Sequence, residues 1–408
     1  MSEGWDVRPL GELCTIKPPK AEARSKLRDV DPVSFVPMED LGVGAKSLIP
    51  SRTRSLGEVS GSYTYFADGD VLLAKITPCF ENGKLGVARG LVNGIGFGSS
   101  EFIVLRPGPE LEAEFLYYYL ARPSFLEDGA RSMTGAVGHK RVAKEFIEAY
   151  PVPLPSRSEQ RRIVAILDEA FEGIAIAKAN AEKNLQSANE LFSVYLQAAF
   201  AQLEGAVPIE KLGHVCEFEG GSQPPKSEFV YAPRSGYVRF LQIRDFGTDK
   251  HETYIPEAKK NRLCNERDIF IGRYGASVGK ILTGKAGAYN VALMKTVPNL
   301  SVLDLDFFHR YLTSGAFQSR LMNVAARSAQ DGFSKEDIFG FPVPLPPLAK
   351  QRAIVEEIDP VHDESQRLAD IYGRKVAALE ELKKSLLHQA FSGALTNCAV
   401  SEEVAELA

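Results

Sequence analysis

The stretch Pro151-Val-Pro-Leu-Pro-Ser-Arg-Ser-Glu-Gln-Arg-Arg-Ile-Val164 decides the fold, because it occurs twice in the chain. It returns 191 residues later as Pro342-Val-Pro-Leu-Pro-Pro-Leu-Ala-Lys-Gln-Arg-Ala-Ile-Val355. Gln197-Ala-Ala-Phe200 returns as His388-Gln-Ala-Phe391 at the same offset. A constant offset from residue 151 to residue 200 leaves no room for an insertion or deletion, so the length of this segment is fixed.

Weaker echoes precede each copy, with an offset that varies. The paired stretches are Phe35–Gly42 with Phe240–Gly247, Gly69–Lys75 with Arg267–Arg273, and Glu114–Leu120 with Asp306–Leu312. The same elements therefore follow in the same order, with loops of different length. We expect two globular units, 1–155 and 202–346, each followed by a fixed-length segment, 156–201 or 347–393, and then an acidic tail, 394–408.

Each fixed-length segment has the apolar spacing of a long helix. In the first, apolar residues recur every three or four positions from Ile163 to Ala199, and the second repeats this from Ile354 to Ala390. Prolines stand where each helix should begin, and Gly393 stands where the second should end. Pro360 falls inside the second stripe, so we expect a kink or break there.

A helix of this size, about 68 Å long, needs a partner for its apolar stripe along its whole length. The second stripe has the same length. A parallel pair would require a long return connection that the sequence lacks, so we predict an antiparallel two-helix coiled coil.

The globular units are predicted to be mixed α/β, which makes the fold class α+β. Short β-rich runs alternate with Gly-rich turns in both units. They lie at 71–73, 86–88, 102–105, 268–271 and 280–282. Helices are expected near 112–121 and 140–148, and near 304–313 and 335–339.

Composition narrows the class of protein. Apolar residues make up 44% of the 408 residues and charged residues 25%, the balance of a soluble globular protein. No stretch is long and apolar enough for a membrane helix, and the polar start Met1–Asp6 predicts no signal peptide. The five cysteines are scattered, which predicts reduced thiols, no metal site and a cytoplasmic protein. The net charge of −5 does not by itself favour a nucleic-acid partner.

The repeated stretch, its echo and the closing Gln389-Ala-Phe-Ser-Gly-Ala-Leu-Thr396 together resemble the specificity subunits of type I restriction–modification systems. The resemblance covers nearly the whole chain and departs from the pattern at Pro360 and Lys350. It implies two target-recognition domains that each read one half of a bipartite site in double-stranded DNA, with the helix pair as a spacer. It also implies two methyltransferase subunits and restriction subunits as partners. The subunit itself would be non-catalytic and without a cofactor, and S-adenosylmethionine would bind the methyltransferase partner.

Two segments in each unit are candidates for DNA contact. The first follows a β-run, and the second precedes the last helix of the unit, where backbone N–H groups can bind phosphate. The candidate residues of the first unit are Lys75, Thr77, Asn82, Lys84, Arg131, Thr134, His139, Lys140 and Arg141. Those of the second unit are Arg273, Tyr274, Ser277, Lys280, Arg327, Gln330, Ser334 and Lys335. The alternative interpretation is a hairpin turn with solvated lysines and an ordinary capped loop.

The aromatic residues Tyr63, Tyr65, Tyr117–Tyr119 and Phe307–Phe308 are interpreted as core residues rather than as platforms for stacking bases. The sequence lacks a methyltransferase cofactor loop, an Asn/Asp-Pro-Pro-aromatic turn, a phosphate loop and a zinc-hydrolase signature. Two other functions stay open: a coiled-coil scaffold that does not bind DNA, and a nucleic-acid enzyme with an unrecognised site.

Overall fold

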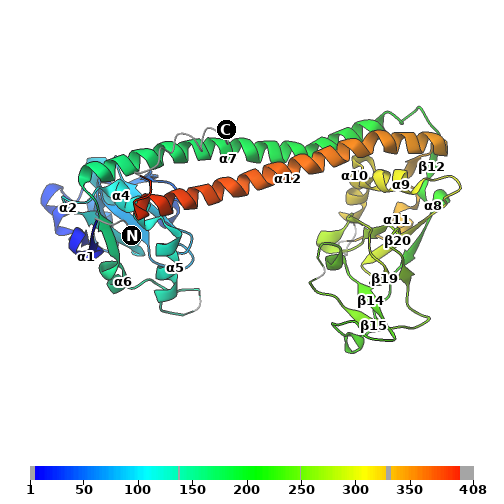
Figure 1. Ribbon diagram of the computed structural model, residues 1–408, viewed down its shortest axis with the longest axis horizontal. Helices are drawn as coiled ribbons and strands as arrows, with labels where there is room; N and C mark the ends of the chain where they lie inside the picture. The colour runs from blue at the N-terminus through cyan, green and yellow to red at the C-terminus, as the bar shows by residue number, and fades with distance from the viewer. Residues whose placement is uncertain (1–4, 137, 249, 328–331, 396–408) are drawn as a thin grey trace. The chain divides into compact units, whose positions relative to one another are not determined.

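The computed structural model describes residues 5–136, 138–248, 250–327 and 332–395 (Figure 1). The chain divides into two compact units, of which the first holds residues 1–181 and 374–408 and the second holds residues 182–373. Strands and helices are mixed in both, as the predicted fold class requires.

The elements of the first unit up to its long helix are short. In chain order they are β1 (Asp6–Pro9), α1 (Leu10–Leu13), β2 (Cys14–Ile16), α2 (Ala21–Lys26), β3 (Pro32–Val36), η1 (Met38–Asp40), β4 (Ser47–Leu48), β5 (Arg52–Ser55), α3 (Leu56–Val59), β6 (Thr64–Ala67), β7 (Val71–Ala74), β8 (Leu85–Ala88), η2 (Val92–Gly94), β9 (Ile95–Gly98), β10 (Phe102–Pro107), α4 (Ala113–Leu120), α5 (Pro123–Ser132), α6 (Lys144–Ala149) and β11 (Pro151–Leu154).

The second unit follows the same plan. Its elements are β12 (Ile209–Lys211), α8 (Leu212–Val215), β13 (Cys216–Gly220), η3 (Lys226–Glu228), β14 (Tyr237–Leu241), η4 (Ile243–Phe246), β15 (Tyr254–Pro256), β16 (Leu263–Cys264), β17 (Phe270–Gly272), η5 (Gly275–Ser277), β18 (Ile281–Leu282), β19 (Gly287–Tyr289), β20 (Leu293–Pro298), α9 (Leu305–Thr313), α10 (Gly315–Ala325), α11 (Lys335–Phe339) and β21 (Pro342–Pro344).

The sheets of the two units match in strand order, except that β4 of the first unit has no counterpart among the described strands of the second. The order β2-β10-β7-β8-β4 in the first corresponds to β13-β20-β17-β18 in the second, and β5-β3-β9-β6 corresponds to β15-β14-β19-β16. Both units also pair their first strand with their last, β1 with β11 and β12 with β21. The parallel contact of β3 with β9 recurs between β14 and β19. The internal repeat that the sequence shows is therefore a repeat of the whole unit.

The long helices are α7 (Arg157–Ala201) and α12 (Leu348–Ser392), each of 45 residues. In the first unit Lys178 of α7 donates to Glu380 of α12, and in the second the Ser365 hydroxyl donates to the Ala188 carbonyl oxygen at 2.8 Å. A later residue of α7 therefore contacts an earlier residue of α12. The predicted antiparallel pairing is confirmed.

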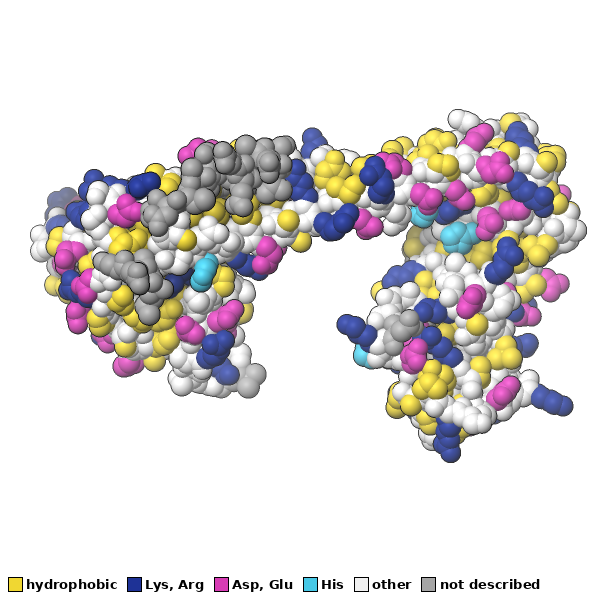
Figure 2. Space-filling model, viewed as in Figure 1, with side chains coloured by type: hydrophobic (Ala, Val, Ile, Leu, Met, Phe, Trp, Pro, Cys, Tyr) yellow, Lys and Arg dark blue, Asp and Glu magenta, His cyan; other side chains and the backbone are white. Residues whose placement is uncertain are grey.

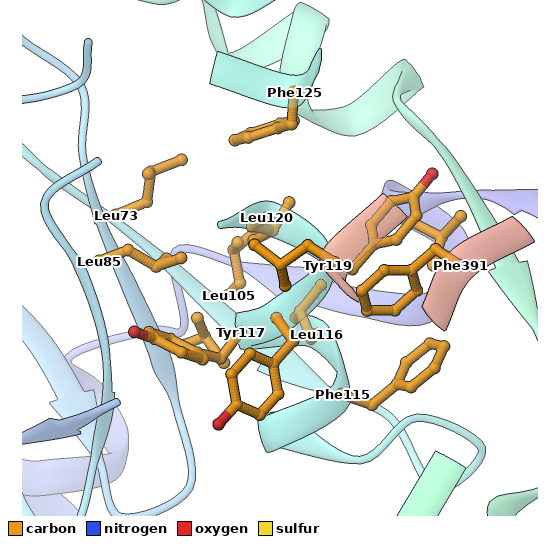
Figure 3. Packing of buried hydrophobic residues seen from close by; sticks show 14 of the residues in the cluster. Leu73, Leu85, Leu105, Phe115, Leu116, Tyr117, Tyr119, Leu120, Phe125 and Phe391 are labelled. Atoms are coloured by element: carbon orange, nitrogen blue, oxygen red, sulfur yellow. The ribbon is translucent and has the colours of Figure 1, made fainter. Parts of the chain in front are cut away.

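The helix pair is part of the core of each unit. In the first, Phe391 of α12 packs against Phe115 and Tyr119 of α4, with ring centroids 5.1 Å apart in both pairs (Figure 3). In the second, Phe200 of α7 packs against Phe307 of α9 at 5.3 Å. The predicted core aromatics Tyr65, Tyr117–Tyr119 and Phe307–Phe308 are buried, and Tyr63 is half-buried.

A buried glutamine explains why the Gln-Arg pair is repeated. Gln160 is fully buried, donates to the carbonyl oxygens of Glu110 and Pro155, and accepts the Glu112 amide at 2.8 Å. This set of three bonds, here called the glutamine clamp, holds the first turn of α7 to the loop before α4.

The second unit repeats the clamp. Gln351 donates to the carbonyl oxygens of Val302 and Pro346, each at 2.8 Å, and accepts the Asp304 amide at 2.7 Å. The following arginine pairs with the same loop, Arg161 with Glu112 and Arg352 with Asp304. Because the clamp uses main-chain partners, the surrounding sequence can vary while the glutamine stays.

Three details of the helices differ from the sequence-based expectation. Of the expected kink or break at Pro360, the break is wrong, since α12 is continuous through it. Pro360 is exposed, so the carbonyl group that loses its amide partner faces solvent. In the last turns of α7 the buried positions are Leu196 and Phe200, whereas the predicted Tyr195 is 38% exposed. Helices α5 and α10 were not predicted.

Candidate nucleic-acid interface

The two candidate segments of the first unit lie side by side. The first is the connection 75–84 between β7 and β8, which pair as an antiparallel hairpin. The Thr77 amide donates to the Lys140 carbonyl oxygen, and the Val142 amide donates to that of Lys75, both at 3.0 Å. Thr134 and Arg141 exchange backbone bonds with each other, which brings the two ends of this segment together. Residues 63 and 67 positions apart in the sequence, Thr77 with Lys140 and Lys75 with Val142, thus meet in one surface.

The second unit brings its two segments together in the same way. The connection 273–280 links β17 to β18, and Tyr274 forms a β-bridge with Gly332 of the second segment. The Arg273 guanidinium also donates to the Phe333 carbonyl oxygen at 3.4 Å. The pairing of these segments is therefore a property of the fold and not of one unit.

In the first unit, helix α5 packs against the connection 75–84 and holds it in place. The Phe80 ring is fully buried and lies edge-on to Phe125 of α5, with centroids 5.8 Å apart. A Cβ atom at Gly129 would come within 2.2 Å of this ring, so only glycine fits there. In the second unit Gln318 of α10 donates to the Gly279 carbonyl oxygen at 2.9 Å.

Carboxylates neutralise part of the positive charge in the first unit. The Nε and Nη2 atoms of Arg141 donate to the Glu101 carboxylate at 2.9 and 2.8 Å. These bonds lower the pKa of Glu101. Lys75 donates to the Ser100 carbonyl oxygen and lies 4.0 Å from Glu101. Lys84 is half-buried and donates to the Met38 carbonyl oxygen.

The remaining candidates of the first unit are more exposed. The Thr77 hydroxyl donates to Glu81 at 2.9 Å. Asn82, Thr134, His139 and Lys140 are exposed. Arg131 is exposed, lies in the last turn of α5 rather than in a loop, and pairs with Glu127 and Asp128. Among these residues Lys140 is thus the cation best placed to meet an outside anion.

In the second unit the candidates carry fewer ion pairs. Tyr274, Lys280, Arg327 and Lys335 are exposed, and Arg273 and Ser277 are half-buried. Ser334 caps α11 together with Asp337, whose carboxylate accepts the Ser334 amide. Because this carboxylate already occupies the first turn, the helix N-terminus is less suited to phosphate than the sequence suggested. Gln330 lies outside the described residues.

The sequence did not single out the residues that complete a cavity in the first unit. This cavity, of about 420 Å³, is lined by five cationic side chains, namely Lys17, Lys20, Lys75, Arg141 and Lys144. Burial, followed by the charges of Lys17 and Arg24, lowers the pKa of Lys20. Lys17 also adopts a left-handed backbone conformation, with φ of 59°, which costs a side-chain-bearing residue free energy.

A second cavity, of about 670 Å³, lies in the second unit. It is lined by Arg244 of η4 together with the candidates Ser277 and Lys280. Arg244 was also missed. The signal for it was present in the repeat, because Arg244 aligns with Glu39, so the charge at this position is opposite in the two units.

The family model described as the type I restriction modification DNA specificity domain matches residues 2–186 and again residues 207–371. The two matches take in most of the chain and coincide with its two repeated halves. The chain belongs to this family.

Among type I specificity subunits, that of the Escherichia coli enzyme EcoEI is 42% identical over 165 residues, and that of EcoAI, also from Escherichia coli, is 36% identical over 165 residues. Each match covers 40% of this chain and only 27% of the relative. The putative MjaX specificity subunit of Methanocaldococcus jannaschii is 22% identical over 346 residues, which is 80% of this chain and 78% of the relative.

Solved structures support the fold. A chain from work on complex assembly and conformational transition of the type I R-M system has a TM-score of 0.78 at 20% identity, covering 97% of this chain and 99% of that one. The HsdS subunit from Thermoanaerobacter tengcongensis has a TM-score of 0.61 at 22% identity, covering 97% and 98%. The type I specificity-subunit fold is thus shared. No helix in the described part of the chain is long and apolar enough to cross a membrane.

Proposed function

We propose that this chain is the DNA-recognition subunit of a type I restriction–modification complex, in which each unit reads one half of an asymmetric bipartite site. The observation that carries the proposal is the paired arrangement of the two candidate segments, which recurs at the same place in both units of the repeat. Two equivalent surfaces with different side chains suit a site made of two unlike half-sequences.

The charges support contact with the DNA backbone. Five cations line one cavity of the first unit, and Lys140 and Lys280 extend from the two surfaces. On the face drawn in Figure 2, Lys and Arg side chains are interspersed with Asp and Glu over both units, and the net charge of the chain is −5. The chain alone therefore binds DNA weakly, and its affinity depends on more basic partners.

The partners follow from the chemistry that the chain lacks. Two methyltransferase subunits would supply S-adenosylmethionine and the pocket for an adenine flipped out of the duplex, since stacking hides its amino group. Restriction subunits would add DNA cleavage. In this proposal the chain is non-catalytic, holds no cofactor and works in the cytoplasm.

The decisive experiment is to co-express the chain with its methyltransferase and map methylated adenines at single-base resolution. We expect one bipartite sequence with a fixed gap. Methylation without sequence preference, or a complex whose DNA affinity does not change with salt, contradicts the proposal and favours a scaffold. Turnover of DNA or S-adenosylmethionine by the purified chain alone favours an enzyme.

Two lysine variants test the interface itself. Lys140→Ala and Lys280→Ala should each weaken DNA binding by the complex for all sequences and lower the salt slope by about one. Lys183→Ala, an exposed position of α7, is the matched control and should bind as the unaltered protein does. Equal effects of all three variants would contradict the placement of the interface.

A further inference from the structure

Arg244 is an exposed cation on a rigid turn. It lies in η4, directly after β14, and this turn is closed by the Gln242 amide, which donates to the buried Asp245 carboxylate at 2.6 Å. Asn290 binds the end of β14, since its amide donates to the Leu241 carbonyl oxygen. Among the described residues, no carboxylate forms an ion pair with Arg244, so its guanidinium is available to an outside acceptor.

Its surroundings match those of a residue that contacts bases. The cavity beside it is shared with Ser277 and Lys280, which belong to the connection already assigned to DNA contact. No Asp or Glu is among the described residues that line this cavity. The polar side chains that line this cavity are one guanidinium fork, one ammonium group, one hydroxyl group and the two carboxamides of Gln242 and Asn290.

In the first unit, the position equivalent to Arg244 carries a side chain of opposite charge, although the secondary-structure elements around it are repeated. Glu39 occupies the equivalent place in η1, and it pairs with Arg52 at 3.0 Å. In that unit Lys84 donates to the Met38 carbonyl oxygen, so η1 also lies against the connection proposed to contact DNA. The backbone is alike in the two units, whereas the charge at this one position is reversed.

We infer that Arg244 is a specificity-determining residue that reads a guanine in the half-site of the second unit. The inference rests on the proposed function. An arginine fork donates two parallel hydrogen bonds to the O6 and N7 atoms of guanine in the major groove, and neither adenine nor a pyrimidine offers this pair of acceptors. A carboxylate at the equivalent place in the first unit repels those acceptors, so the two units differ in the base that they accept there.

The test uses the complex with the methyltransferase and a library of duplexes randomised over both half-sites. For Arg244→Ala we expect the guanine preference at one position of one half-site to fall on the order of ten- to a hundredfold. Arg244→Lys keeps the charge but lacks the fork, so it should lose part of that preference, whereas the non-specific DNA affinity and its salt slope stay nearly unchanged. Preferences in the other half-site stay as they are.

Lys280→Ala and Glu39→Gln are the controls. The first should weaken all sequences alike, and the second should leave the position read by Arg244 unaltered. Thermal unfolding of each variant checks that it folds. If Arg244→Lys keeps the full preference and Arg244→Ala weakens every sequence equally, Arg244 contacts phosphate and the inference is wrong. If the unaltered complex itself shows no sequence preference, it is the proposed function that fails.

Discussion

Gln160 shows how one uncharged side chain fixes a long helix to a domain. Its amide group makes three hydrogen bonds to main-chain atoms on both sides of the junction, and none of its surface is exposed. Buried main-chain groups that lose their partners cost free energy, because no water replaces the lost bond. The clamp is therefore a structural feature, although its sequence is part of what identifies the family.

Replacement of this residue should destabilise the first unit. We expect Gln160→Leu to lower the free energy of unfolding by about 3 kcal/mol, since the Glu112 amide and two carbonyl groups lose their partner. Urea unfolding measures the loss, and hydrogen exchange should show that the Glu112 amide is no longer protected. Gln186→Leu, at an exposed position of α7, serves as the control. Equal stability of the two variants would rule out the clamp as described.

Thiol reactivity offers a second prediction for single residues. Burial raises the pKa of Cys14 and of Cys216 to about 12, so both thiols stay protonated and inaccessible at pH 8. Cys79 is half-buried and lies in the connection 75–84. We expect iodoacetamide to modify Cys79 well before Cys14 or Cys216, and cognate DNA in the complex to slow that modification. Peptide mass mapping gives the rates, and a Cys79 rate unaffected by DNA would count against the interface.

At this scale the sequence predicted residue types better than their environment. It proposed Lys75 and Arg141 as DNA-contacting cations, but it could not show that Glu101 pairs with both of them. Such pairs join side chains distant in sequence, and their geometry depends on the complete fold. Arg244 was missed for another reason. The only signal for it in the sequence is that its charge is opposite to that of Glu39, the aligned residue of the first unit.

Among the elements, the two long helices were the most predictable. Their apolar spacing and equal length define extent and pairing, because a stripe on a long helix must be covered along its length. The short helices α5 and α10 carry no comparable pattern and follow directly after α4 and α9. The helix does not break at Pro360, because propensity at one exposed position is outweighed by the packing of many others.

Pro360 nevertheless has a measurable cost. We expect Pro360→Ala to raise the free energy of unfolding by about 2 kcal/mol, since alanine restores an amide that can donate to the Glu356 carbonyl group. The midpoint of urea unfolding reports the change. Asp363→Ala, also exposed on α12, should shift it by less than about 0.5 kcal/mol. An unchanged midpoint in Pro360→Ala would mean that the helix already compensates for the missing bond.

At the scale of the whole molecule, the proposed function implies that the length of the helix pair sets the gap between the two half-sites. Seven residues inserted into α7 between Ala181 and Glu182, and seven into α12 between Gly373 and Arg374, lengthen each helix by about 10 Å. We expect the gap in the methylated site to grow by about three base pairs while both half-site sequences stay the same.

Insertion into α7 alone is the control for this prediction. It shifts one apolar stripe against the other, so that variant should be less stable than either the unaltered protein or the double insertion. Methylation mapping and thermal unfolding give the two readouts. A double insertion that leaves the gap unchanged would show that the helix pair does not set it.

The glutamine clamps also bear on how such genes diversify. All partners of Gln160 lie in the first unit, and all partners of Gln351 lie in the second. A recombination crossover within the α7 coding region, near codon 181, therefore replaces residues 1–181 by those of another gene without separating either clamp from its partners. New combinations of half-sites can then arise in one genetic event, provided that Phe391 of α12 still packs against α4 of the incoming segment.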